Sequence, residues 1–337
     1  MKKLSKLFTV ALVSLLSVSC LTACDSEKAA YPDRDITMII PFGAGGGTDV
    51  WARAIAAGLA EDLGVNVTPN NITGGSAGST GTQAAWDAAH DGYTLLGTSE
   101  TPLTIPVTTP IERTAKDYEY FIAAGSPGLV CINAKAAETL GIKTMDDLVA
   151  YGDKESINIA GTTGGLWFAL SSLLIEESYG NLGFTFVPYD GSAGAIQAAA
   201  GGVDAILVTA SAGEVAQYLE SGDLIALANM APEAYGDVPS VVDSVPAIAS
   251  SLPLNQWLGF SVPSDTPQEV LDTLTESFNK VMATDKIKEL AESQSAIVFN
   301  LTGEKAKEMA LASEKSLCNV LYELGQAQYN PADKGIK

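Results

Sequence analysis

Short apolar runs alternate along this chain with longer segments of helical periodicity. Residues 35–41 (DITMIIP) form a near-continuous apolar run of strand type, and the Ala-rich residues 48–63 predict a helix that opens with the capping residues Thr48 and Asp49. The pattern then predicts a strand over 65–68, a helix over 79–89 and a strand over 93–98. This βαβαβ order is typical of a parallel sheet with helices on both faces.

A second series of the same kind follows. Strands are expected at residues 120–124, 129–132, 157–160, 184–187 and 205–208, with helices at 166–179 and 193–200. The C-terminal part offers one strand, 258–262, and helices at 268–284 and 302–324, which is too little for a third sheet. We therefore expect two α/β lobes, the first made of residues 31–126 and 253–337 and the second of 127–252.

The N-terminus has the pattern of a processing signal. Three lysines precede the apolar residues 7–16, a run too short to span a bilayer as a helix. The sequence Leu-Thr-Ala-Cys ending at Cys24 looks like a bacterial lipobox, whereas Cys20 is the weaker candidate because Ser17 stands where the pattern has leucine. Residues 1–23 are thus expected to be a lipoprotein signal peptide, Cys24 the acylated first residue of the mature protein, and 24–30 a tether.

Composition narrows the function classes. The chain has 337 residues, of which 47% are hydrophobic and 18% charged, as expected of a globular protein. Its formal charge of −21 would repel a phosphate backbone, so nucleic-acid binding is not expected. The single histidine, His90, excludes sites that need two imidazoles, and we read it as a solvated residue at a helix end. No metal or other cofactor is expected.

The two remaining cysteines fall inside predicted elements. Cys131 lies in the apolar run 129–132 and Cys318 in the helical pattern of 316–324. Each is expected to be a small buried hydrophobic residue, although a disulfide between them stays open in an oxidising compartment.

Glycine-rich loops follow several predicted strands, and each precedes a predicted helix. The first amides of a helix lack internal acceptors, and glycine lets a ligand approach the backbone closely, so each junction can bind an anion. One such loop is often no more than a turn, but several together favour a ligand site at the carboxyl ends of the strands. The loops are residues 42–47 (FGAGGG), 74–81 (GGSAGSTG), 161–165 (GTTGG) and 191–194 (GSAG).

Three enzyme motifs match these loops poorly. Residues 43–48 approximate a dinucleotide-binding fingerprint, but Thr48 replaces its third glycine, and the lysine of a phosphate-binding Walker loop is missing. Residues 74–78 (GGSAG) satisfy the nucleophile pattern of serine hydrolases, with Ser76 as the nucleophile. The only histidine lies in the same supersecondary unit instead of far downstream, so a hydrolase remains a distant alternative.

Six ordered blocks resemble the Bug or TctC family of extracytoplasmic solute-binding proteins, the receptors of tripartite tricarboxylate transporters. The resemblance covers essentially the whole mature chain. His90 stands where members often have proline, and Trp167 and Phe168 stand where small polar residues are common. The blocks are residues 31–49 (YPDRDITMIIPFGAGGGTD), 91–96 (DGYTLL), 187–191 (VPYDG), 201–204 (GGVD), 237–240 (DVPS) and 257–267 (WLGFSVPSDTP).

The resemblance implies an α/β, two-lobed periplasmic-binding-protein fold of type II, with a mixed sheet and flanking helices in each lobe. It implies a monomeric receptor without catalytic activity, which closes on a small di- or tricarboxylate and delivers it to the permease subunits in the membrane. An uncharged or amphipathic solute, such as an amide or vitamin, is the alternative ligand.

The expected binding residues come from the glycine loops and their neighbours. None of the three arginines, Arg34, Arg53 and Arg113, lies in a glycine loop, so amides, hydroxyls and helix N-termini are expected to hold the carboxylate. The expected residues are Phe42, Gly43, Ala44, Gly45, Gly46, Thr48, Ser76, Ala77, Thr98, Gly161, Thr162, Thr163, Gly164, Gly165, Ser192 and Asp204.

Overall fold

The computed structural model of the chain describes residues 31–176, 182–252 and 254–336. The expected signal peptide, the lipidated Cys24 and the tether lie outside these ranges. Residues from Arg34 onward form one compact unit. Within the described ranges, no helix combines the length and the apolar character that a bilayer crossing requires.

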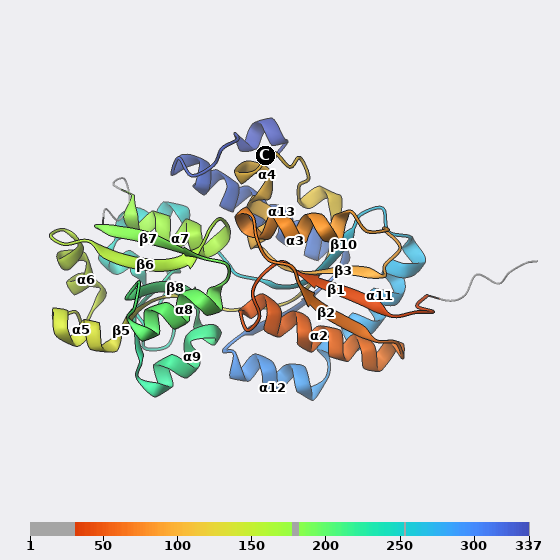
Figure 1. Cartoon of the computed structure of the whole chain (residues 1–337), viewed down its shortest axis with the longest axis horizontal. Helices are drawn as coiled ribbons and strands as arrows, with labels where there is room; N and C mark the ends of the chain where they lie inside the picture. The colour runs from red at the N-terminus through yellow and green to blue at the C-terminus, as the bar shows by residue number, and fades with distance from the viewer. Residues whose placement is uncertain (1–30, 177–181, 253, 337) are drawn as a thin grey trace, which may run out of the picture. The chain divides into compact units, whose positions relative to one another are not determined.

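The first sheet has six strands in the order β11-β4-β10-β3-β1-β2. Figure 1 labels β10, β3, β1 and β2 of this sheet. β1 pairs in parallel with both β2 and β3, whereas β10 runs antiparallel between β3 and β4. β11 closes one edge, antiparallel to β4. The strands are β1 (Ile36–Ile40), β2 (Val67–Asn71), β3 (Thr94–Ser99), β4 (Tyr118–Gly125), β10 (Leu258–Pro263) and β11 (Ile297–Leu301).

Helices on this sheet bury one apolar face each. In α2 the side chains of Trp51, Ile55 and Leu59 recur at helical spacing and are almost fully buried. Phe260 of β10 stacks on Phe121 of β4, with ring centroids 4.3 Å apart. The elements of this half are α2 (Gly47–Leu63), α3 (Ser79–Trp86), α4 (Ile105–Thr108), α11 (Gln268–Met282) and α12 (Asp285–Ser293), with short 3-10 turns η1 (Ser76–Gly78), η2 (Thr101–Thr104) and η3 (Ala115–Asp117).

The second sheet has five strands in the order β7-β6-β8-β5-β9. β6 pairs in parallel with β7 and β8, and β5 runs antiparallel to both β8 and β9. The strands are β5 (Gly128–Asn133), β6 (Ile157–Thr162), β7 (Phe184–Tyr189), β8 (Leu207–Ser211) and β9 (Leu224–Asn229). The helices are α5 (Ala134–Leu140), α6 (Met145–Gly152), α7 (Gly165–Ile175), α8 (Ser192–Gly201), α9 (Ala212–Ser221), α10 (Val241–Ser244) and the 3-10 turn η4 (Pro246–Ser251).

One long helix, α13 (Gly303–Glu323), contributes to both cores. Near its start, Ala306 and Ala310 pack with Trp257 against the first sheet. Near its end, Leu317 and Leu321 pack into the apolar core of the second sheet. The chain therefore joins the two halves through α13 as well as through the β4–β5 and η4–β10 connections. The short turn η5 (Pro331–Lys334) follows α13 in the chain.

The predicted parallel βαβαβ unit and the return of residues 258–262 to the first sheet are confirmed. The strand expected at 120–124 was grouped with the second series, but β4 belongs to the first sheet. β9, β11 and helices α5, α6, α9 and α12 were not predicted; each of these helices has ten residues or fewer, which is shorter than the window over which helical periodicity is judged. The boundaries proposed for the two lobes stay a prediction.

The cysteines are buried hydrophobic residues, as predicted. Cys131 and Cys318 are both free, so the disulfide left open by the sequence is not formed. Burial raises the pKa of the Cys131 thiol to about 12, which keeps it protonated and unreactive.

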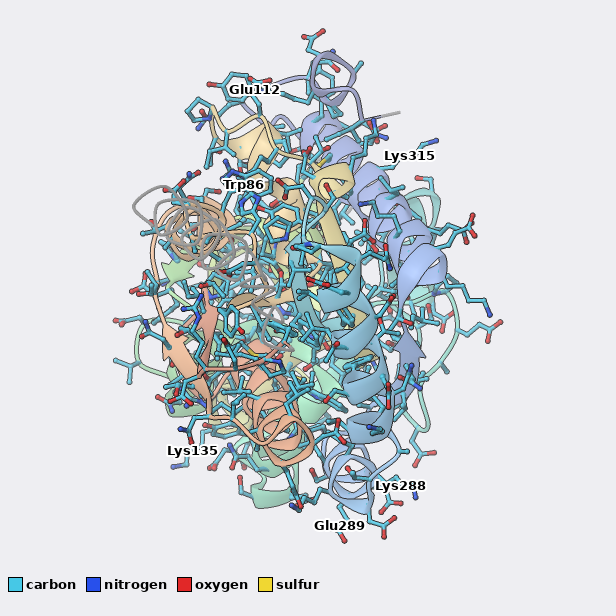
Figure 2. All side chains as sticks on the ribbon, turned by 90° about the vertical axis from the view of Figure 1, so that its right-hand side faces the viewer. Trp86, Glu112, Lys135, Lys288, Glu289 and Lys315 are labelled. Atoms are coloured by element: carbon cyan, nitrogen blue, oxygen red, sulfur yellow. The ribbon has the colours of Figure 1, made fainter. Side chains whose placement is uncertain are left out.

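Charge is carried on the surface. In Figure 2 the labelled side chains of Glu112, Lys135, Lys288, Glu289 and Lys315 all point away from the ribbon, and all five residues are exposed. Such dispersed charges serve solubility. The buried acids are therefore the ones that need a separate explanation.

Candidate functional site

Each glycine loop leads into the N-terminus of a helix, as the sequence predicted. Gly47 begins α2, and a Cβ placed on its neighbour Gly46 would lie 2.8 Å from Oγ of Ser192, the first residue of α8. Gly165 likewise begins α7, close to Thr101 of the first half. The loops of the two sheets therefore meet face to face.

Three backbone amides donate hydrogen bonds between the two halves at these loops. They connect residues at least 61 positions apart in sequence, so they report tertiary packing and not local turns. The bonds run from Gly47 N to Glu214 Oε1 (2.7 Å), from Ala77 N to the Thr163 carbonyl (3.0 Å) and from Gly165 N to Thr104 Oγ1 (3.1 Å).

A cleft of about 30 Å³ lies between the loops. A cavity needs about 10–15 Å³ to hold one water, so this space is sufficient for a few waters at most. Six of its lining residues were expected from the sequence: Phe42, Gly43, Gly46, Thr48, Thr162 and Ser192. Six were not: Ser99, Glu100, Thr101, Trp167, Glu214 and Gln256.

The other expected residues lie elsewhere. Ala44 and Gly45 are exposed on the same loop as Gly46, and Gly161 is covered by the Phe186 ring. Thr98 lines a different cavity, and Asp204 is exposed, with its carbonyl accepting from Asn158 near the start of β6. The remaining five form the contact between the halves beside the cleft: Ser76, Ala77, Thr163, Gly164 and Gly165.

The sequence contains signals for some of the cleft residues that were not predicted. Glu100 directly follows β3, and Glu214 lies three residues after the end of β8, so both stand at the carboxyl ends of strands. Trp167 was noted as unusual, and its indole lines the cleft. Gln256 precedes β10, at a crossing between the halves that sequence periodicity does not reveal.

Asp49 holds the first glycine loop in place. It accepts from the amide of Gly45 (2.9 Å), from Arg53 Nε (2.8 Å) and from Asn71 Nδ2 (2.8 Å). Burial raises the pKa of Asp49, but these three donors together outweigh burial and hold it below its usual value. Arg53 thus supports the loop from outside the cleft.

The other two arginines are also engaged away from the cleft. Arg34 pairs with Asp91 (2.9 Å), and the Arg113 guanidinium lies 4.7 Å from the centroid of the Trp86 ring. The cleft as described is lined by no arginine, lysine or histidine. A bound carboxylate would therefore meet amides and hydroxyls there. The amides of Gly43 and Gly46 have no acceptor among the described residues.

Glu100 is the most deeply buried acid of the cleft, with 1% of its surface exposed. Its Oε2 accepts from the backbone amide of Trp257 (2.9 Å) and its Oε1 from the hydroxyl of Thr101 (3.2 Å). The pKa of Glu100 is raised to about 7, because burial and, to a smaller extent, the charge of Glu214 outweigh the hydrogen bonds that lower it.

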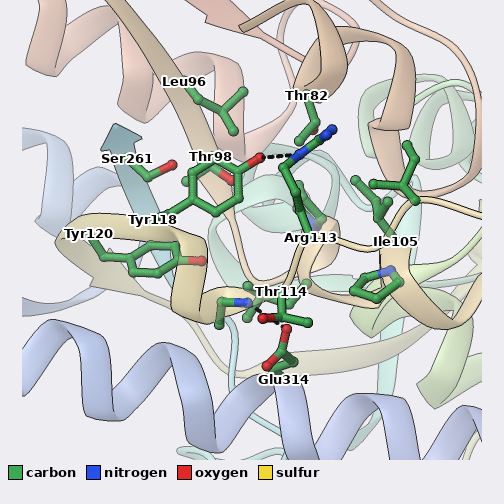
Figure 3. Close-up of a pocket in the computed structure, with 15 residues that line it drawn as sticks. Thr82, Leu96, Thr98, Ile105, Arg113, Thr114, Tyr118, Tyr120, Ser261 and Glu314 are labelled. Carbon is green, nitrogen blue, oxygen red and sulfur yellow. Dashed lines mark hydrogen bonds between the residues drawn. The ribbon is translucent and has the colours of Figure 1, made fainter. Parts of the chain in front are cut away.

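A second cavity, of about 20 Å³, lies inside the first half (Figure 3). Thr82 Oγ1 and Ser261 Oγ line it without a hydrogen-bond partner, and the space suits a single bridging water. Burial raises the pKa of Glu314, on its floor, to about 7, while the Ala115 amide donates to this carboxyl group (2.6 Å). None of the glycine loops lines this cavity.

The arrangement does not support hydrolysis at Ser76. The ring nitrogens of His90 are bonded to Asp265 (2.6 Å) and to the Trp86 carbonyl (2.9 Å). His90 is thus held at the end of α3 by these contacts and is not simply solvated. Within the described ranges, no three histidine, cysteine, aspartate or glutamate side chains are grouped to hold a metal ion.

Comparisons with known proteins concern the family and the fold of this chain. The family described as TctC, "Tripartite tricarboxylate transporter family receptor", matches residues 51–320. Protein BugT of Bordetella pertussis is 26% identical over 325 residues, which covers 94% of this chain and 97% of BugT. Two solved structures from Rhodopseudomonas palustris share the fold. Rpa4515 with adipate has a TM-score of 0.76 at 22% identity (88% of this chain, 99% of that one), and MatC with bound malate has 0.76 at 20% identity (86% and 100%).

Proposed function

Because the chain belongs to the tripartite tricarboxylate transporter receptor family, we propose that it captures a small organic carboxylate in the cleft between its two sheets and delivers it to the permease subunits of such a transporter. This is a receptor family, so the protein binds its solute without converting it. The observation that carries the proposal is the convergence of glycine-loop amides and helix N-termini from both halves on one cleft. Adipate and malate in the two relatives support a carboxylate.

The amides of Gly43 and Gly46, with the hydroxyl of Thr48, are the donors best placed for the carboxylate, since all three residues line the cleft near the start of α2. Thr162 and Ser192 add hydroxyls from the other half. Contact-range donors outweigh the repulsion of distant surface acids, because screening at physiological salt acts over about 8 Å.

Solute uptake requires the two halves to move apart. A cleft of about 30 Å³ has no room for a six-carbon dicarboxylate, so the contacts between the loops must open first. We propose that the connections near residues 125–130 and 250–257 bend during this opening. α13, which packs in both cores, limits how far the halves separate.

The uncharged or amphipathic solute remains the second candidate, and the two acids of the cleft favour it over a highly charged tricarboxylate. We further propose that a lipid on Cys24 anchors the receptor to the membrane, which keeps it near its permease.

The test is a thermal-shift screen of the mature protein with C3 to C8 mono-, di- and tricarboxylates, their amino-substituted analogues and their amides. A ligand at 100 times its dissociation constant stabilises the folded state by about 2.7 kcal/mol, a readily measured shift. Stabilisation by one or a few carboxylates is expected. Stabilisation by amides alone would show that the ligand is the second candidate, an uncharged solute, and not a carboxylate.

A further inference from the structure

The cleft carries more negative charge than a carboxylate site should. Glu100 and Glu214 both line it, and no cationic side chain does. Glu214 Oε1 accepts from the Gly47 amide and its Oε2 from the Ser211 hydroxyl (2.7 Å), and Ser192 Oγ donates to it as well. Through the bond from Gly47, the carboxyl group of Glu214 occupies the N-terminus of α2.

Glu100 has acceptor capacity that the protein does not fill. A carboxylate offers about four lone-pair positions, and Glu100 accepts from the Thr101 hydroxyl, from the amide of Trp257 and from its own amide. The bond from Trp257 fixes the carboxyl group at the crossing into β10. The remaining position of Glu100 is available to a donor in the cleft.

Gln256 supplies an independent observation. This residue is 5% exposed and lines the same cleft, and its Oε1 has no hydrogen-bond partner among the described residues. Buried side-chain acceptors are nearly always paired in native proteins, either with protein or with ordered water. An unpartnered acceptor next to two carboxyl groups indicates that a donor from outside the chain belongs there.

We infer that the solute carries a primary ammonium group besides its carboxylate, and that Glu100, Glu214 and Gln256 bind this ammonium. The inference rests on the proposed function and names its ligand class, a small aminocarboxylate. An ammonium has three N–H donors for the three acceptors, whereas the second carboxylate of a dicarboxylate would face two like charges. Its own carboxylate then lies at Gly43, Gly46 and Thr48.

A bound cation would act on the ionisation of Glu100. Burial and, to a smaller extent, Glu214 raise the pKa of Glu100 to about 7. A cation within about 4 to 6 Å would favour the ionised carboxylate and lower this pKa. A bound ammonium would therefore offset the negative charge of both Glu100 and Glu214.

The experiment is calorimetric titration of the mature protein at pH 8 with ligands matched in chain length. Succinate, glutarate and adipate are each compared with the ω-aminocarboxylate and the α-aminocarboxylate of the same number of carbons. We expect an aminocarboxylate to bind at least tenfold more tightly than the dicarboxylate of its length. Tighter binding of the dicarboxylate at every length overturns this inference and leaves the proposed carboxylate receptor standing. Absence of binding in both sets overturns both.

Variants separate the ammonium contacts from general effects. Glu100→Gln keeps the shape and an acceptor for the Trp257 amide but removes the charge, so the preference for the aminocarboxylate should fall at least tenfold. Glu220→Gln, an exposed acid on the same helix as Glu214, is the matched control and should leave the preference unchanged. Should Glu100→Gln not fold, Gln256→Met tests the same site and should weaken the aminocarboxylate alone. An unchanged preference in a folded Glu100→Gln or Gln256→Met protein overturns the assignment.

Discussion

The backbone amide of Gly47 donates to Oε1 of Glu214 over 2.7 Å, so the first residue of α2 is bonded to a carboxylate from the other half of the molecule. A carboxylate at a helix N-terminus is favourable because the amides there lack internal acceptors. Glu214 thus occupies the kind of position that a ligand carboxylate could take, and its bond to Gly47 connects the two halves.

Replacing Glu214 should destabilise the unliganded protein. Glu214→Ala leaves the buried Gly47 amide without its acceptor, which costs about 1–3 kcal/mol of unfolding free energy. The measurement is urea unfolding monitored by circular dichroism. Glu220→Ala on the exposed side of α9 is the control, expected within about 0.5 kcal/mol of the wild type. Equal stability of the two variants would show that the Glu214 bond contributes nothing.

Glu100 should make stability depend on pH. Its pKa is raised from 4.5 to about 7 in the folded state, so between these values the unfolded chain releases the proton while the folded protein retains it. Folding stability therefore falls as pH rises from about 4.5 to 7, by on the order of 1 kcal/mol per pH unit, and the loss is complete above pH 7.

Denaturation midpoints of Glu100→Gln at several pH values check this. In this variant, folding stability should fall less steeply between pH 4.5 and 7 than in the wild type. Glu314, whose pKa burial also raises to about 7, accounts for a second part of this fall that Glu314→Gln removes. Profiles of Glu100→Gln and the wild type that superimpose would contradict a raised pKa at Glu100.

Arg53 should matter little for solute affinity. It lies outside the cleft and bonds to Asp49, which keeps the donors Gly45 and Asn71 when Arg53 is removed. We expect Arg53→Ala to weaken binding less than threefold in a calorimetric titration. Loss of binding in this variant would indicate a direct arginine–carboxylate contact and remove the argument from backbone amides.

Membrane anchoring is expected to depend on one thiol. Cys24→Ser removes the atom that would carry the lipid, so the protein should move from the membrane fraction to the soluble fraction. Immunoblots of fractionated cells give the answer. Cys20→Ser is the control and should stay at the membrane. Retention of Cys24→Ser at the membrane would show that the lipid is attached to another residue.

Much of the architecture could be predicted from the sequence because buried parallel strands are continuous apolar runs. Residues 35–41 and 157–160 were placed correctly for this reason, and the glycine loops marked the helix starts that follow them. β11 was missed because it has only five residues, and so short an apolar run does not by itself distinguish a strand from other structure. α13 was found as a helix, but its packing into both cores depends on tertiary contacts.

The candidate site was half predictable. Loop residues such as Gly46 and Thr48 could be predicted from the glycine content of the loop and from the capping position. The acids Glu100 and Glu214 could not, because most acids of this chain lie on the surface and a single sequence does not distinguish a buried one. Their role depends on the approach of two elements more than 100 residues apart, β3 and α9.

The central claim, a solute held between the glycine loops of the two halves, is tested most directly at Gly164. This residue has φ +77°, and a Cβ there would lie 2.9 Å from Ser76 Oγ and 3.1 Å from Ala77 Cβ, so valine would keep the halves from meeting. Gly141→Val is the matched control, because Gly141 has φ +73° but nothing within 4 Å.

The measurement is calorimetric titration of both variants and the wild type with the tightest ligand from the screen. The account predicts that one solute binds per chain, that Gly164→Val binds it at least tenfold more weakly, about 1.4 kcal/mol, and that Gly141→Val retains the wild-type affinity. Wild-type affinity in a folded Gly164→Val protein would contradict a site between the loops.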